Sequence, residues 1–246
     1  MTTDPQAPST ARMIDYWLSG TRHHPIDVAA AQAFEGAYGP CAAIFRSLRA
    51  FSGRAARYLA AEGVDQFLVF GAGIPAQGNV HETVPDARVL YTDVDPEIVA
   101  AGRELLAGRP NVDYVLGDAA DPRGIDAAAL DRALPDHATR PVGLIFLGLA
   151  AFLDDATLAR ALDAMYDLVP AGSRLAFDFD AMELAGYPEA LAMMGPGFHM
   201  REPADFGKLL GRWQVTADGI VPVADWRPDG TPEQVPDAFW GGVATK

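Results

Sequence analysis

From Gln66 onward, short apolar runs alternate with segments of helical periodicity, and this alternation constrains the fold more than any other feature of the chain. The apolar runs are residues 67–70, 88–91, 114–116, 142–147 and 174–177, and the helical segments lie near residues 79–84, 96–107, 126–134 and 154–168. Strands that alternate with helices are typical of βαβ units, whose strands run parallel in one sheet. We therefore expect an α/β domain. A helix near residues 203–210 and strand-like runs at 213–226 and 239–245 complete it, with a turn or bulge at residues 218–219.

The first part of the chain has a different texture, because it carries helical signals and no evident strand-like run. Ser9 can cap a helix that extends to Leu18, Asp27 precedes an alanine-rich helix, and residues 42–61 place apolar side chains at helical spacing. We interpret residues 1–62 as an N-terminal helical cap and residues 63–246 as the α/β domain.

Composition narrows the class of partner and the cellular location. The chain of 246 residues is 50% hydrophobic, and its 33 acidic residues outnumber 19 basic residues to give a net charge of -14. Such a charge repels the phosphates of nucleic acids and of anionic membranes, so we expect neither as a partner. The single cysteine, Cys41, can form no internal disulfide. Without a signal peptide or an apolar run of about 20 residues, the default location is the cytoplasm.

A glycine turn, Gly71-Ala-Gly73, follows the first apolar run. Glycines let backbone amides approach a ligand closely, although any tight turn between a strand and a helix can use two glycines. The next strand ends at Asp93, and an acidic residue about 20 positions beyond the glycines is placed to accept hydrogen bonds from ribose hydroxyls. We assign Gly71, Gly73, Asp93 and the adjacent Val94 to a nucleotide site, whereas Asp95 can cap the next helix.

The third strand is followed by Asp118 and Ala119. The carboxylate can accept a hydrogen bond from an adenine amino group while the next backbone amide donates to the ring, and the alternative is an aspartate that only stabilises a turn. A nicotinamide dinucleotide site is a rival interpretation, because residues 71–76 also fit the pattern G-x-G-x-x-A. Pro75 disfavours it, since proline removes one of the amides expected to face a pyrophosphate.

Short segments spread over the chain match the motifs of one known family. They are residues 11–20 (ARMIDYWLSG), 49–51 (RAF), 71–75 (GAGIP), 78–82 (GNVHE), 91–96 (YTDVDP), 219–223 (GIVPV), 226–229 (WRPD) and 241–246 (GGVATK). In these segments the chain resembles an actinobacterial family of S-adenosylmethionine (SAM)-dependent methyltransferases that was long catalogued as a domain of unknown function. The resemblance implies a Rossmann-like class I methyltransferase fold. Its sheet is seven-stranded and mostly parallel, with an antiparallel last strand, an N-terminal helical cap, and SAM as the cofactor over the strand ends.

The chain departs from the family pattern in three respects. The family's Gly-Gly and Asn after the first helix are Ser19-Gly20 and the His23-His24 region here, and its usual histidine at the end of the fourth strand is Ala151. The third departure concerns the cofactor. Val69 and Phe70 stand where the family usually has an acidic residue just before the first glycines, and that carboxylate generally helps to hold the methionyl end of SAM. Either SAM is held differently, through Gln77, Asn79 and His81, or the fold has been put to another use.

Candidates for the chemistry lie in the cap and in the irregular region before the last helix. Methyl transfer requires an aligned acceptor, and a general base helps only when the acceptor must lose a proton. We take Tyr16 and His24 in the cap and His199 in the irregular region as candidates. Histidine titrates near neutral pH, which suits a general base. A surface or structural role is the alternative for each residue. His23 and His24 do not predict a metal site, since no second group of ligands has a recognisable spacing.

The sequence thus predicts a SAM-dependent methyltransferase that acts on a small molecule, in secondary metabolism by the family resemblance. Two alternatives stay open: a methyltransferase-like fold that performs elimination or cyclisation, and a non-catalytic partner subunit on the same fold. Retention of SAM by the purified protein would favour the first interpretation. Neither the acceptor nor the oligomeric state, whether a homodimer or a hetero-complex, follows from the sequence.

Overall fold

The structure, a computed structural model, describes residues 7–75, 78–231 and 233–246. Its strands are β1 (Gln66–Phe70), β2 (Arg88–Asp93), β3 (Val112–Leu116), β4 (Gly143–Phe146), β5 (Arg174–Asp180), β6 (Gln214–Val215), β7 (Val221–Pro222) and β8 (Phe239–Thr245). Within the described residues they form one sheet in the order β3-β2-β1-β4-β5-β8-β6, and β7 also pairs with β8. Strands β1 to β5 are parallel, whereas β8 runs antiparallel to β5. The predicted mostly parallel sheet with an antiparallel C-terminal strand is confirmed.

The run expected at residues 213–226 differs from the prediction, because it contains two short strands, β6 and β7. Between them the Gly219 N–H donates to the Thr216 carbonyl at 3.0 Å, and Gly219 has a φ of 75° that favours glycine. The turn expected at this point therefore divides the run. Over the described residues the sheet has 8 strands, one more than the sequence indicated.

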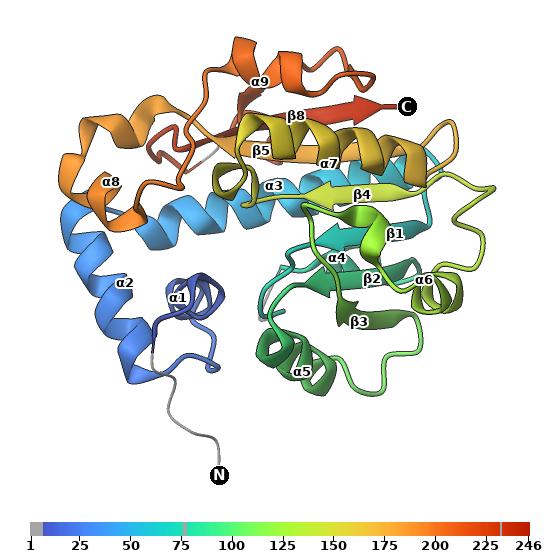
Figure 1. Ribbon diagram of the computed structural model, residues 1–246, viewed down its shortest axis with the longest axis horizontal. Coiled ribbons are helices and arrows are strands. Elements are labelled where there is room, and N and C mark those ends of the chain that lie inside the picture. Colours follow the sequence, from blue (N-terminus) through green and yellow to red (C-terminus); the bar gives the residue numbers. More distant parts are fainter. Residues whose placement is uncertain (1–6, 76–77, 232) are drawn as a thin grey trace.

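Helices cover both faces of the sheet (Figure 1). They are α1 (Thr10–Trp17), α2 (Pro25–Tyr38), α3 (Cys41–Ala61), α4 (Val80–Thr83), α5 (Pro96–Leu105), α6 (Ala127–Ala133), α7 (Asp155–Leu168), α8 (Pro188–Met194) and α9 (Pro203–Leu209), with 3₁₀ turns η1 (Pro122–Gly124), η2 (Ala150–Phe152) and η3 (Met182–Gly186). Helix α3 lies behind the sheet and α7 in front of it, while α1 and α2 lie together to one side (Figure 1). The helices thus leave the carboxyl ends of the parallel strands facing α1.

Two hydrophobic cores explain why the strands read as continuous apolar runs. Phe67 and Val69 of β1 pack in the core that also contains Phe51 of α3, whereas Leu68 and Phe70 pack in the core that contains residues of α7. Since successive side chains of a strand point to opposite faces, a strand covered on both faces has to be apolar throughout.

The N-terminal helices are tied together by a buried carboxylate, and one predicted boundary is corrected. Helix α2 begins at Pro25, with His24 as its N-cap, so Asp27 lies inside the helix instead of preceding it. The Asp27 carboxylate accepts the Ser9 and His24 amides, each at 2.9 Å, and pairs with Arg12 at 2.8 Å. Burial alone would raise the pKa of Asp27, but these hydrogen bonds and the Arg12 charge hold it below its usual value. The starts of α1 and α2 are therefore fixed to each other.

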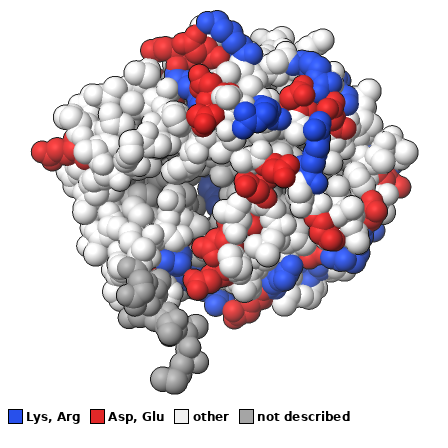
Figure 2. Space-filling view, viewed as in Figure 1, with Lys and Arg blue, Asp and Glu red and all other residues white. Residues whose placement is uncertain are grey.

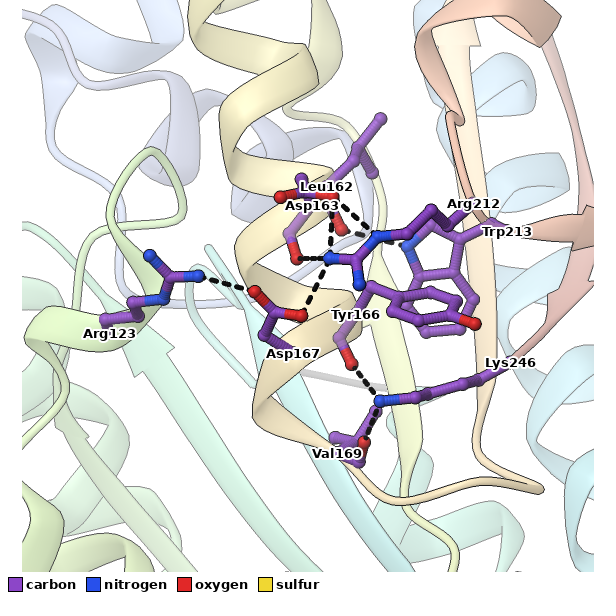
Figure 3. Close-up of polar contacts among 9 residues, drawn as sticks. All are labelled: Arg123, Leu162, Asp163, Tyr166, Asp167, Val169, Arg212, Trp213 and Lys246. Atoms are coloured by element: carbon purple, nitrogen blue, oxygen red, sulfur yellow. Dashed lines mark hydrogen bonds and ion pairs between the residues drawn. The ribbon is translucent and has the colours of Figure 1, made fainter.

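A cluster of charges on α7 holds the last elements of the chain (Figure 3). Arg212, which follows α9, pairs with Asp163 and Asp167 at 2.6 and 2.7 Å, and its guanidinium lies 4.2 Å from the centroid of the Tyr166 ring. The Lys246 ammonium lies 4.4 Å from the same centroid and donates to two carbonyls at the end of α7. These contacts attach α7 to the segments that flank β6 and β8.

Candidate functional site

A cavity of about 440 Å³ opens where β1 to β4 end, at the point where the strand order reverses between β1 and β4. Ligands of open α/β sheets bind at this kind of crevice. The residues lining it come from α1, α3, α5, β1 and the loop after it, the ends of β2, β3 and β4, and the segments that follow these strands: Ser9, Thr10, Ala11, Ile14, Leu18, Phe45, Leu48, Arg49, Ser52, Val69, Phe70, Gly71, Ala72, Gly73, Ile74, Asp93, Val94, Asp95, Ile98, Gly117, Asp118, Ala119, Ala120, Ile145, Leu147, Gly148, Leu149, Phe152 and Leu153. Figure 2 shows this face hollowed near its centre, with mostly uncharged surface toward α2 and α8.

The glycine turn forms one wall of the cavity. Gly71 and Gly73 have positive φ angles of 52° and 64°. A Cβ on Gly71 would lie 2.4 Å from a methyl carbon of Leu149, so a side chain here would require Leu149 to shift. The Gly73 amide donates to the Asp93 carboxylate at 3.0 Å, and its carbonyl accepts the Tyr114 hydroxyl at 2.7 Å. The turn is thereby fixed to β2 and β3.

Asp93 ends β2 at the cavity and is 9% exposed. One of its carboxylate oxygens accepts the Gly73 amide and the other accepts the Asp95 amide at 3.1 Å. Each oxygen has two lone pairs, so both keep the capacity to accept a further hydrogen bond. Burial raises the pKa of Asp93, and the two amides oppose that effect. Asp95 accepts the Glu97 amide at 2.8 Å, which is the capping role considered for it in the sequence.

The adenine side predicted from the sequence also lies in the cavity. Val94 is 62% exposed there, which leaves an apolar surface for a ring to cover. Asp118 and Ala119 follow β3, and Oδ1 of Asp118 accepts the Ala120 amide at 2.8 Å. The turn role considered for Asp118 is therefore present, and its second oxygen has no hydrogen bond within the described residues.

Three predicted cofactor residues are placed elsewhere or are not described. Asn79 caps α4 and His81 is buried, with its backbone amide and ring Nδ1 at 3.1 and 2.8 Å from the Tyr91 hydroxyl. Burial lowers the pKa of His81. Neither residue lines the cavity. Gln77 lies outside the described residues.

The candidate catalytic residues also lie outside the cavity lining. The Tyr16 hydroxyl accepts from the Gln32 side chain at 3.3 Å, and His24 caps α2. The His199 amide donates to the Ala151 carbonyl at 2.8 Å, next to η2. Within the described residues, no group of three His, Cys, Asp or Glu side chains is placed to hold a metal ion. None of the described helices has the length and apolar character that crossing a membrane requires.

Several residues of the site were not identified from the sequence. Arg49 of α3 projects into the cavity, and the only signal for it was its place in the RAF segment. Leu149 and Phe152 follow β4, in a stretch without an evident motif. Behind them the Gly148 amide donates to the buried Asp178 of β5 at 2.6 Å. These residues reach the cavity only through the packing of α3 and the β4–α7 connection against the sheet.

Comparison with known proteins agrees with this geometry. The family model described as S-adenosyl methyltransferase matches residues 1–246. A DUF574 family protein from Streptomyces avermitilis is 31% identical, with 99% of each chain covered and a TM-score of 0.86. A protein from Thermobifida fusca is 28% identical, with 98% of this chain and 95% of that chain covered and a TM-score of 0.86. Magnesium protoporphyrin IX methyltransferase from Synechocystis, solved with SAH, shares the fold at 13% identity, a TM-score of 0.60 and coverage of 95% and 92%. No curated protein sequence matches the chain.

Proposed function

The chain belongs to the S-adenosyl methyltransferase family, and from that premise we propose that this SAM-dependent methyltransferase methylates a small molecule in secondary metabolism. One observation carries the proposal: a cavity of about 440 Å³ brings Gly71, Asp93 and Asp118 together beneath α1. Its volume lies within the range of about 300–1,000 Å³ that is usual for small-ligand sites. The net charge of -14 further disfavours nucleic acid as the acceptor.

The residues of the cavity fit the parts of SAM. The Asp93 carboxylate can accept hydrogen bonds from the ribose hydroxyls, and the exposed side chain of Val94 offers an apolar face to adenine. The second carboxylate oxygen of Asp118 can accept from the adenine amino group, and Ala119 supplies the adjacent amide. When bound, SAM supplies an electrophilic methyl group on a sulfonium. The apolar side chains of Leu48 and Leu149 line the same cavity.

For an acceptor that must lose a proton, we keep His199 as the proposed base. Its amide is bonded to Ala151, which lies in the same 3₁₀ turn as the cavity-lining Phe152. Tyr16 of α1 and His24, the N-cap of α2, are the remaining candidates. A cytoplasmic location completes the proposal, in line with the single buried Cys41.

Titration calorimetry with SAM tests the cofactor placement. Asp93→Ala should weaken SAM binding by about 1–3 kcal/mol, the usual cost of losing a charged hydrogen-bond partner. Asp118→Ala should cost less, because one neutral contact is lost. Asp121→Ala is the matched control, since this carboxylate is three residues beyond Asp118 but does not line the cavity. Tight SAM binding that Asp93→Ala leaves unchanged would show that the ribose lies elsewhere.

The absence of an acidic residue just before Gly71 also leads to an expected affinity for SAM. Val69 and Phe70 line the cavity without supplying a counter-charge for the sulfonium, so we expect a dissociation constant near 1 μM, or about -8 kcal/mol. Incubation with methyl-labelled SAM and extracts of the producing cell tests the reaction itself. Conversion of a metabolite without SAM, and without label in the product, would replace methyl transfer by the elimination or cyclisation alternative.

A further inference from the structure

Arg49 is the basic side chain of the cavity. It lies on the same face of α3 as Phe45, Leu48 and Ser52, which line the cavity with it at helical spacing. Among the lining residues that the structure describes, no other is Lys or Arg. The acidic lining residues Asp93, Asp95 and Asp118 come from the opposite wall, at the ends of β2 and β3. The cavity is therefore polarised, with one cation on α3 and carboxylates on the sheet.

The guanidinium of Arg49 is not neutralised within the described part of the chain. Its Nη1 donates to Oδ1 of Asn79 at 3.1 Å, and the described residues offer it no ion pair and no other hydrogen bond. Burial lowers the pKa of Arg49, and the nearby Tyr91, Glu82 and Tyr114 oppose that effect. Arginine nevertheless stays protonated in proteins. The Arg49 side chain is half-buried, and its one hydrogen bond within the described residues goes to a neutral amide, so an anionic ligand group would stabilise this site.

The position of Arg49 near the loop that begins with the glycine turn indicates which anionic group of the ligand it would bind. Asn79, its partner, follows the loop that begins at Gly71, and a Cβ on Gly78 would lie 3.8 Å from the Cβ of Arg49. Asp93 and Asp118, whose carboxylates suit the ribose and the adenine, lie at the ends of β2 and β3 instead. SAM has a single anionic group, the α-carboxylate of its methionyl part, and a planar guanidinium binds a carboxylate through two parallel hydrogen bonds.

We propose that Arg49 binds the α-carboxylate of SAM and that Asn79 is a positioning residue, which holds the Arg49 guanidinium toward the cavity. This inference rests on the proposed function, because it assumes that SAM occupies the cavity. It also gives Asn79 an indirect role at the cofactor site, through Arg49 instead of through SAM itself. The same cation could serve a carboxylate on the acceptor, and the two sources of the carboxylate are separated by the choice of ligand.

The test is a ligand–variant cycle with SAM and decarboxylated SAM, which keeps the adenosine, the sulfonium and the amine and lacks only the carboxylate. In the wild type, SAM should bind about 10- to 100-fold more tightly than the decarboxylated ligand, as expected for a charge-assisted contact. Arg49→Met should remove most of that preference by weakening SAM and not the decarboxylated ligand, because methionine keeps the apolar stem. Arg49→Lys should restore part of it. Asn79→Ala should reduce the preference by a smaller factor and leave decarboxylated SAM unaffected.

Arg46→Met is the matched control. Arg46 lies one turn earlier on α3, is exposed, pairs with Glu233 at 3.0 Å and does not line the cavity, so its replacement should leave both affinities unchanged. An equal loss of both ligands in Arg49→Met would overturn the proposal, because Arg49 would then only shape the pocket. Unchanged SAM binding would also overturn it. If Arg49→Met does not fold, equal affinity of the wild type for the two ligands decides against the proposal. Failure of the wild type to bind either ligand would instead contradict the proposed function.

Discussion

Two aspartates at the end of β5 should make the stability of the protein depend on pH. Asp178 is fully buried, and its Oδ2 has no hydrogen-bond partner within the described residues. Burial raises its pKa well above the usual value, and the charge of Asp180 adds to the effect. Burial also raises the pKa of Asp180 from 3.8 to about 7, although Arg201 opposes the shift. We predict that Asp180→Asn removes part of a stability loss that the wild type suffers as the pH rises.

The sign follows from the protons that each state binds. Below pH 3.8, Asp180 is protonated in both the folded and the unfolded chain, so the stability of the protonated folded form is fully present. Between pH 3.8 and about 7 the unfolded chain releases the proton while the folded chain keeps it, and the free energy of unfolding falls over that window. At about 1.4 kcal/mol per pKa unit the full shift corresponds to at most about 4 kcal/mol. Since Asp180 is only half-buried by accessible surface, we expect about 2 kcal/mol.

Urea unfolding followed by circular dichroism at pH 4.5 and pH 8 measures this effect. The difference in unfolding free energy between Asp180→Asn and the wild type should grow in favour of the variant by about 2 kcal/mol between the two pH values. The unfolding free energy of Asp178→Asn relative to the wild type should change in the same direction, because burial raises the pKa of Asp178 as well. Asparagine keeps an oxygen that can accept the Gly148 amide. Asp86→Asn, at an exposed position, serves as the control. Differences that stay constant with pH for both β5 variants would refute the reasoning.

Two further predictions concern the walls of the cavity. Gly71→Ala should weaken SAM binding in calorimetry, because its Cβ, at a φ of 52°, would lie 2.4 Å from a Leu149 methyl and push that side chain within the cavity wall. Gly63→Ala is its control, since Gly63 has a φ of 89° but open space around it; loss of SAM binding in both variants would attribute the effect to backbone strain alone. Deletion of residues 9–35 should abolish turnover and leave a folded sheet by circular dichroism, because this segment includes the cavity-lining residues of α1. Full activity of the truncated protein would show that the cap is dispensable.

The sequence by itself determined the sheet and the residues next to its strand ends. The apolar runs predicted at residues 67–70 and 174–177 lie within β1 and β5, because strands that are covered on both faces must be apolar throughout. Gly71, Asp93 and Asp118 were identified for a related reason. Gly71 directly follows β1, Asp93 is the last residue of β2 and Asp118 lies two residues beyond β3. Since the carboxyl ends of parallel strands meet at one edge, position along the chain was enough to place them in one cavity.

Only the tertiary structure decided what closes the cavity and which polar residues enter it. His81 and Arg49 both lie in segments that resemble the family, but Tyr91 holds His81 inside the protein whereas Arg49 reaches the cavity. Asp178 reads as part of a strand, and its burial behind Gly148 depends on how β4 and β5 pair. Local periodicity reports whether a residue is buried, because burial selects apolar side chains. The partner of a polar side chain depends on contacts between segments far apart in the chain, and no local pattern encodes those contacts.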